Sequence, residues 1–205
     1  MRLILVHGLG RTPLSQMILG MRLRAAGFEV AYFGYSATFS SFDATVERLV
    51  ERLRAVGDRY ALVGHSLGCI LIRAALPSLD PAPAACFFLA PPNHAPRAAT
   101  RFAGHRLFRA LTGDSGSRLA DPVFMDALPV PDVPTRIYAG TAGPGEPFDG
   151  DPNDGIVAVS ETRLDERIPV IEVPSLHTFI MNSRIVANDI IATLQTEPSD
   201  QGSGA

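Results

Sequence analysis

Short apolar runs alternate along the whole chain with longer stretches in which apolar and polar residues recur at helical spacing. Six of the apolar runs lie at residues 3–6, 29–35, 60–63, 85–90, 135–140 and 170–173. Continuous apolar runs of this length, closed by turn residues, are typical of strands that are buried on both faces of a parallel sheet. The pattern therefore predicts six such strands.

The stretches between these runs predict amphipathic helices. A first helix is expected over residues 13–26, with an inward stripe of Leu14, Met17, Ile18 and Met21. The clearest is residues 42–56, where one face is apolar and the other carries glutamate and arginine. A third helix is expected from Ser66 to about residue 76. The last is expected over residues 178–194, with these residues facing inward: Ile180, Ile190, Ile191 and Leu194.

Strict alternation of strand and helix predicts a single α/β domain over residues 1–196, because right-handed crossovers then build a parallel sheet with helices on both faces. Residues 92–134 are longer than a simple crossover needs and form an insertion, with helix-like pieces at 97–111 and 121–128. This arginine-rich insertion is either a packed helix with a solvated basic face or a small lid over the site. The polar residues 197–205 are expected to be a disordered tail.

Composition narrows the function classes. Hydrophobic residues make up 46% and the net charge is −3, so nothing in the overall balance predicts a nucleic-acid partner, a general membrane affinity or stable membrane insertion. No run is long enough to span a bilayer, and the apolar part of the N-terminus is too short for a signal peptide, so a cytoplasmic location is expected. Cys69 and Cys86 lie within apolar runs and are expected to be buried thiols.

The strongest motif is Gly64-His65-Ser66-Leu67-Gly68, which has the form G-x-S-x-G. It follows an apolar strand and precedes an apolar helix, the context in which this motif holds a nucleophilic serine at a tight turn. Glycine at both flanks allows the close backbone approach that the turn requires. The alternative interpretation is a serine that merely caps a helix.

A serine nucleophile needs a base and an acid, which in hydrolases built on such sheets follow in the order serine, acid, histidine. His177, after the last strand, is the predicted base, with His94 as the fallback. His105, in the insertion, is expected to face solvent. Asp154 is the predicted acid, because the apolar residues after it would anchor it, and Asp151 is the second choice. We therefore predict the catalytic set Ser66, Asp154 and His177.

An oxyanion needs two N–H donors, which we assign to Leu67, directly after the nucleophile, and to Leu9, with Gly8 as the second choice. His7, Gly8 and His94 are expected to line the substrate site, with the His7 side chain bracing the loop more than touching substrate. The Asp149–Asn153 run resembles the start of a calcium loop, but Asp154 stands where such loops have glycine and Ser160 where they have glutamate. We therefore predict no metal site.

Taken together, these motifs resemble the α/β-hydrolase fold, and within it the minimal bacterial lipases and esterases and the hydrolase domains related to GPI inositol-deacylase. The resemblance covers the chain to about residue 194. It implies a cofactor-free serine triad that hydrolyses small-molecule carboxylic esters. A thioesterase or acyltransferase on the same triad, and a non-catalytic ligand-binding protein of the same fold, are the alternatives.

Overall fold

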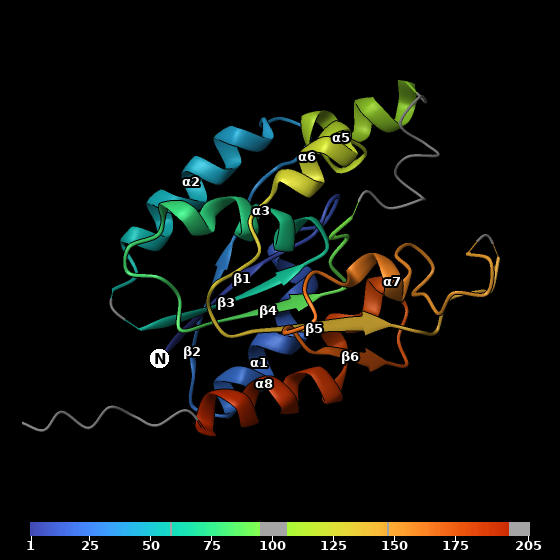
Figure 1. Cartoon of the computed structure of the whole chain (residues 1–205). Coiled ribbons are helices and arrows are strands. Elements are labelled where there is room, and N and C mark those ends of the chain that lie inside the picture. The colour runs from blue at the N-terminus through green and yellow to red at the C-terminus, as the bar shows by residue number, and fades with distance from the viewer. Residues whose placement is uncertain (58, 95–105, 147, 197–205) are drawn as a thin grey trace, which may run out of the picture.

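The structure is a computed structural model that describes residues 1–57, 59–94, 106–146 and 148–196, excluding the side chains of 106–112. Within these residues six strands form one fully parallel sheet in the order β2-β1-β3-β4-β5-β6 (Figure 1). Their bounds are β1 Arg2–Val6, β2 Glu29–Phe33, β3 Tyr60–His65, β4 Ala85–Leu89, β5 Thr135–Gly140 and β6 Val170–Val173. The predicted six-stranded parallel sheet is confirmed.

The alternating side chains of the strands divide the core into two halves. Ile4 and Val6 of β1 pack on one face with residues of α2 and α3, while Leu3 and Leu5 pack on the other with residues of α1 and α8. Accordingly α1 Met17–Ala25 and α8 Arg184–Thr196 cover one face (Figure 1). The other face carries α2 Phe42–Arg54, α3 Leu67–Ala75, α5 Arg106–Leu119 and α6 Pro122–Ala127.

The sheet register brings distant residues to one edge. Val6 pairs with Gly64, His65 with Leu89, and Gly140 with Val173, so the segments that follow β1, β3, β4, β5 and β6 all leave from the carboxyl edge. Because parallel strands end together, residues that are more than a hundred positions apart can meet there. This edge positions the candidate site.

The first helical segment differs from its prediction in two ways. It is a 3-10 helix, η1 Pro13–Gln16, followed by α1, and the side chains that face the core are those of Leu19 and Leu23. The predicted inward stripe is wrong, because its four side chains are among the most exposed apolar groups: Leu14 71%, Met17 43%, Ile18 41% and Met21 53%. Gly20 lets the helix lie close to the ring of Tyr32 in β2. The side of the helix that carries Leu19, Gly20 and Leu23 therefore faces the sheet, and the predicted stripe faces away from it.

The C-terminal helical region is also divided. A 3-10 helix, η3 His177–Asn182, precedes α8, and Ser183 lies between them. Ile180, Ile190 and Leu194 are buried as predicted, while Ile191 is partly buried. A further short helix, α7 Val159–Thr162, was not predicted. Its first turn is closed by Glu161 Oε2, which accepts the backbone N–H of Ala158 at 2.9 Å.

The described part of the insertion docks onto the helix layer. Asp114 Oδ2 accepts the N–H of Phe42 at the start of α2, and Arg118 forms an ion pair with Asp43 at 2.9 Å. The helix α5 is kinked at Gly113, where φ is +59°. Residues 97–105, with His105, and the tail 197–205 lie outside the described residues.

The base of the insertion is held by one buried arginine. Arg73 of α3 is 2% exposed and donates to the carbonyl and side-chain oxygens of Asn93, both at 3.3 Å. It also donates to Leu128 O at 2.8 Å and Pro129 O at 3.1 Å. Burial lowers the pKa of Arg73 to about 10. One guanidinium thus fixes both ends of the segment that leaves after β4 and returns before β5.

Among the described residues, none of the helices combines the length and the apolar character that a bilayer-spanning helix needs. Cys69 and Cys86 are buried free thiols, as predicted, and burial raises the pKa of both.

Candidate active site

Ser66 occupies a strained turn between β3 and α3. Its backbone has φ 53° and ψ −120°, a conformation that L-residues rarely adopt. Two flanking glycines allow the turn, since a Cβ at Gly64 would lie 2.8 Å from the backbone of Cys69 and one at Gly68 would collide with the carbonyl of Val6. The N–H of Ser66 donates to Leu89 O at 2.9 Å, which ties the turn to β4. The serine is therefore held at the carboxyl edge of the sheet.

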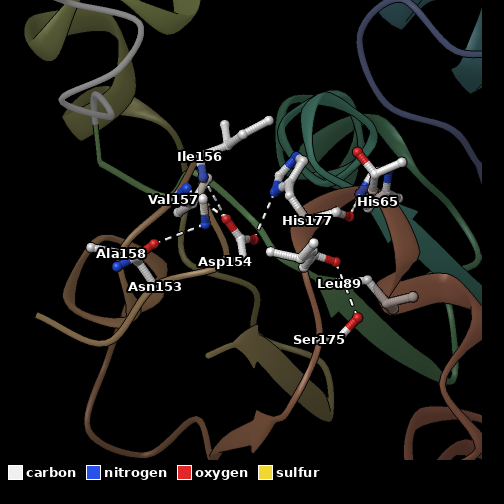
Figure 2. Close-up of polar contacts among 12 residues, drawn as sticks. His65, Leu89, Asn153, Asp154, Ile156, Val157, Ala158, Ser175 and His177 are labelled. Atoms are coloured by element: carbon white, nitrogen blue, oxygen red, sulfur yellow. Dashed lines mark hydrogen bonds and ion pairs between the residues drawn. The ribbon is translucent and has the colours of Figure 1, made fainter. Parts of the chain in front are cut away.

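Asp154 and His177 are joined at the same edge (Figure 2). His177 Nδ1 lies 2.7 Å from Asp154 Oδ2, and the backbone N–H of His177 donates to Asp154 O at 2.9 Å. Both side chains are buried: that of Asp154 is 1% exposed and that of His177 is 8% exposed. A carboxylate accepts hydrogen bonds, so the proton of the neutral imidazole sits on Nδ1 and leaves the Nε2 lone pair free to accept one.

The carboxylate of Asp154 is itself fixed by its own turn. Asp154 Oδ1 accepts the N–H of Ile156 at 2.9 Å and of Val157 at 2.7 Å, so Oδ2 remains for His177. A Cβ at Gly140, the last residue of β5, would lie 2.6 Å from both Asp154 Cβ and Ser175 O. Because Gly140 has no side chain, two segments can approach the end of β5. They are the turn that carries Asp154 (the acid turn) and the loop that leads to His177 (the histidine loop).

His65 supports the histidine loop from beneath the serine turn. Its Nε2 donates to the carbonyl of His177 at 3.0 Å, and the two imidazole centroids are 4.9 Å apart (Figure 2). Burial, then the neighbouring His177, holds the pKa of His65 well below its ordinary value. Since the carbonyl can only accept, the neutral His65 carries its proton on Nε2, and its buried Nδ1 has no hydrogen-bond partner among the described residues.

Two candidate oxyanion donors border Ser66. The N–H of Leu67 is at the first position of α3, where no acceptor exists within the helix and the helix dipole is positive. The loop after β1 lies against the serine turn, because a Cβ at Gly8 would be 3.1 Å from Ser66 Cβ and 2.8 Å from His65 Nδ1. The predicted donor Leu9 follows Gly8 in this loop.

His7 is buried under the loop that it was expected to brace. Its Nδ1 donates to Gly8 O at 2.9 Å, and its ring stacks on Tyr35 with centroids 4.3 Å apart. The Tyr35 hydroxyl donates to His7 O at 2.8 Å. Burial lowers the pKa of His7 and raises that of Tyr35, so both are neutral near pH 7. The His7 side chain, 1% exposed, faces the protein interior.

The structure does not bring His94 to the other predicted residues. Its side chain is exposed, with Nδ1 3.5 Å from Asp126 Oδ1 of α6. It lines a hollow of about 230 Å³ with residues between α7 and the start of β6. The second-choice acid, Asp151, accepts a hydrogen bond from Ser160. Of the predicted bases and acids, His177 and Asp154 are therefore the pair in contact.

The turn that resembles the start of a calcium loop uses its side chains internally. Asn153 donates to Pro144 O at 2.7 Å and to Asp151 O at 3.1 Å, and its Oδ1 accepts the N–H of Gly155 at 2.8 Å. In the part of the chain that the structure describes, no group of three or more histidine, cysteine or acidic side chains is placed to hold a metal ion.

Two supporting contacts were not anticipated from the sequence. The sequence motif predicts no contact for the His65 side chain, and no feature of it singles out Tyr35. A signal for Tyr35 exists, because it follows β2, the neighbour of β1, and would reach the same edge as His7. The bond from His65 to His177 O has no local signal, since the two residues are 112 positions apart.

The described contacts include no hydrogen bond between the Ser66 hydroxyl and the His177 imidazole. What the structure brings together is an oriented imidazole, a buried carboxylate, a strained serine and a helix N-terminus at one strand edge. Such a set can deprotonate a hydroxyl and stabilise an oxyanion, provided that the imidazole reaches the serine when substrate binds. Catalytic hydrogen bonds are often long before that point.

The chain belongs to the alpha/beta hydrolase family, which it matches over residues 3–187. Among solved structures it is similar to the mature Bacillus licheniformis lipase BlEst2, with a TM-score of 0.77, 18% identity, and coverage of 94% of this chain and 91% of that chain. It is also similar to a pyrethroid hydrolase from Sphingobium faniae, with a TM-score of 0.66, 12% identity, and coverage of 96% and 98%.

A third similar structure is tomato methylketone synthase I complexed with 2-tridecanone, with a TM-score of 0.62, 14% identity, and coverage of 95% of this chain and 96% of that chain. No curated protein matches the chain. At these identities the structural likeness establishes the fold, and the same fold carries different chemistries.

Proposed function

We propose that this protein is a serine hydrolase that cleaves small-molecule carboxylic esters without a cofactor. Ser66 is the nucleophile, His177 the general base, Asp154 the residue that orients His177, and the N–H groups of Leu9 and Leu67 the oxyanion donors. The observation that carries the proposal is the Asp154–His177 hydrogen bond at the strand edge that also holds Ser66 with a positive φ.

The chemistry follows from the proton positions. His177 Nε2 takes the proton of the Ser66 hydroxyl as Oγ attacks the ester carbonyl, and the carbonyl oxygen becomes an oxyanion held by two N–H groups. The C–O bond to the alcohol breaks, and the alcohol leaves with the proton from His177. A water molecule then gives one proton to His177 while its oxygen attacks the acyl carbon. The bond between the acyl carbon and Ser66 Oγ breaks, and His177 returns the proton to Oγ, which releases the carboxylic acid and restores the serine.

Relatives of the fold support hydrolysis as the reaction class, since two of the similar structures are named as a lipase and a pyrethroid hydrolase. The similarity to these two hydrolases is the observation that favours ester hydrolysis over acyl transfer to an alcohol. A panel of oxygen esters and thioesters, with and without an alcohol acceptor, separates the two reactions and the thioesterase alternative.

The nucleophile is tested by labelling with a fluorophosphonate. The wild-type protein is expected to be labelled at Ser66, and Ser66→Ala is expected to lose labelling and to lower kcat by about 10⁴-fold or more. Ser78→Ala, at an exposed serine of the 3-10 helix Leu76–Ser78, is the matched control and should label normally. Equal labelling of Ser66→Ala and wild type would remove the assignment.

A further inference from the structure

A strip of apolar side chains lies exposed beside the candidate active site. Five of the ten large hydrophobic residues that are exposed among the described residues belong to it: Leu14, Met17, Ile18, Met21 and Phe179. The first four recur at helical spacing along η1 and α1, so they lie on one side of that segment. We call these five residues the apolar strip.

Two hydrogen bonds join the two segments that carry the strip. Arg11 Nη2 donates to Thr178 Oγ1 at 2.8 Å, and Arg22 Nη1 donates to Asn182 O at 2.6 Å. Leu14 to Met21 lie between the two arginines in the chain, and Phe179 lies between Thr178 and Asn182. The two segments therefore run side by side, and Phe179 lies on the segment next to the one that carries the other four residues.

The two segments that carry the strip contain arginines and no acidic residue. Residues 1–28 contain no aspartate or glutamate, and neither do residues 173–188, although the whole chain has a net charge of −3. The same two segments carry Arg11, Arg22, Arg24 and Arg184. Their described contacts include no carboxylate: Arg24, for example, donates to the Tyr32 hydroxyl and to Val30 O. The overall acidity of the chain thus hides a local cationic surface.

We propose that the apolar strip and its arginines dock this protein on anionic lipid bilayers. Apolar side chains that enter the headgroup boundary, ringed by cations that attract acidic headgroups, form the recognised chemistry of interfacial binding. The strip borders both loops of the candidate site, because η1 follows the Gly8–Gly10 loop and η3 begins at His177 itself. Docking would turn the mouth of that site toward the lipid.

A second copy of the chain is the other occupant that an exposed apolar strip could accept. In a two-fold dimer the strip would face itself, because such interfaces use the same surface on both subunits. The arginines of both copies would then approach one another without a carboxylate to pair with, which opposes association. Charge complementarity therefore favours the anionic bilayer.

Vesicle co-sedimentation tests the proposal on the full chain. The protein is expected to sediment with phosphatidylcholine vesicles that contain about 30% phosphatidylglycerol, weakly or not at all with phosphatidylcholine alone, and less as salt rises. The paired variant Met17→Ser/Met21→Ser should lower the affinity about tenfold, and Arg184→Gln about fivefold. Ser66→Ala should bind like wild type, which keeps this result independent of the proposed hydrolysis.

Matched controls are the paired variant Phe39→Ser/Val123→Ser, at exposed apolar residues outside the strip, and Arg52→Gln on α2. Both should bind like wild type. The proposal is overturned if anionic vesicles bind no protein, if neutral vesicles bind equally well, or if the controls lose as much affinity. It is also overturned if sedimentation velocity shows a dimer that the Met17→Ser/Met21→Ser variant dissociates.

Discussion

Asp154 and His177 are connected twice, through side chains at 2.7 Å and through the backbone N–H of His177 to Asp154 O at 2.9 Å. The second bond fixes the start of η3 relative to the acid turn, so the imidazole is positioned by main chain as well as by its carboxylate. Ring orientation therefore does not depend on the side-chain hydrogen bond alone, and the two contributions can be separated by mutation.

Asp154→Asn is expected to keep the fold and lose turnover. An asparagine Oδ1 can still accept the N–H groups of Ile156 and Val157, but its amide would face His177 Nδ1 and favour the wrong tautomer. We expect kcat on a water-soluble ester to fall by about 10⁴-fold, with the thermal midpoint within a few degrees of wild type. Asp151→Asn is the control, and a comparable loss of kcat in it would contradict the assignment of Asp154.

Gly8→Ala is expected to disturb the serine turn directly. The added methyl group would lie 2.8 Å from His65 Nδ1 and 3.1 Å from Ser66 Cβ, so the loop after β1 has to move away from the serine. Displacing an oxyanion donor costs on the order of a hundredfold in kcat. Gly145→Ala, where an added Cβ meets nothing within 4 Å, should leave kcat unchanged. Wild-type kcat in Gly8→Ala would show that this loop does not serve the reaction.

Acid should destabilise the protein through its buried histidines. The pKa values of His7 and His65 lie below their ordinary value of 6.5 in the folded chain, mainly because both are buried. Above pH 6.5 both histidines are mainly neutral in the folded and in the unfolded chain. As the pH falls below 6.5, the unfolded chain binds protons that the folded chain does not. The free energy of unfolding should then fall by up to about 1.4 kcal/mol per pH unit for each histidine.

Urea unfolding between pH 7.5 and about pH 5 measures this slope. His65→Gln keeps an N–H donor for His177 O and removes one titrating group, so its slope should be about half that of wild type. His94→Gln, at an exposed side chain, is the matched control and should retain the full slope. An unchanged slope in His65→Gln would contradict the role given to its burial.

Arg73→Met should destabilise the protein strongly. The guanidinium is buried, and its loss leaves the carbonyls of Leu128 and Pro129 and the side chain of Asn93 without this donor. Removing the partner of buried polar groups costs about 1–3 kcal/mol for each group left unsatisfied. We expect a total loss of at least about 2 kcal/mol in urea unfolding, against less than about 0.5 kcal/mol for Arg52→Gln on the surface of α2. A small effect in Arg73→Met would mean that water replaces the arginine.

The strands could be predicted closely from the sequence because a strand buried on both faces needs a continuous apolar run. Residues 135–140 and 170–173 match β5 and β6 residue for residue. The first helix shows where this reasoning stops. Its segment is apolar on two sides, so periodicity alone could not decide which side faces the core. The close fit of Gly20 against Tyr32 decides it, and that contact exists only in the folded molecule.

The candidate site likewise has residues that could be predicted from the sequence and contacts that could not. Ser66, Asp154 and His177 could be singled out from motif and chain order, because each follows a strand that ends at one edge. The contact from His65 to His177 O could not be predicted, since the two residues are 112 positions apart in the sequence. The net charge says nothing about the local distribution of charge, because it averages an acid-free N-terminal segment with acidic residues elsewhere.

The anchoring of Asn93, Leu128 and Pro129 by Arg73 has a consequence for how this protein can diversify. The segment between these anchor points starts and finishes at positions set by α3, whatever its own length. Substituting a shorter or longer connection there would leave strand pairing and the serine turn in register. A connection of a different length could therefore be exchanged at this one place, while the sheet and the Ser66 turn keep their positions.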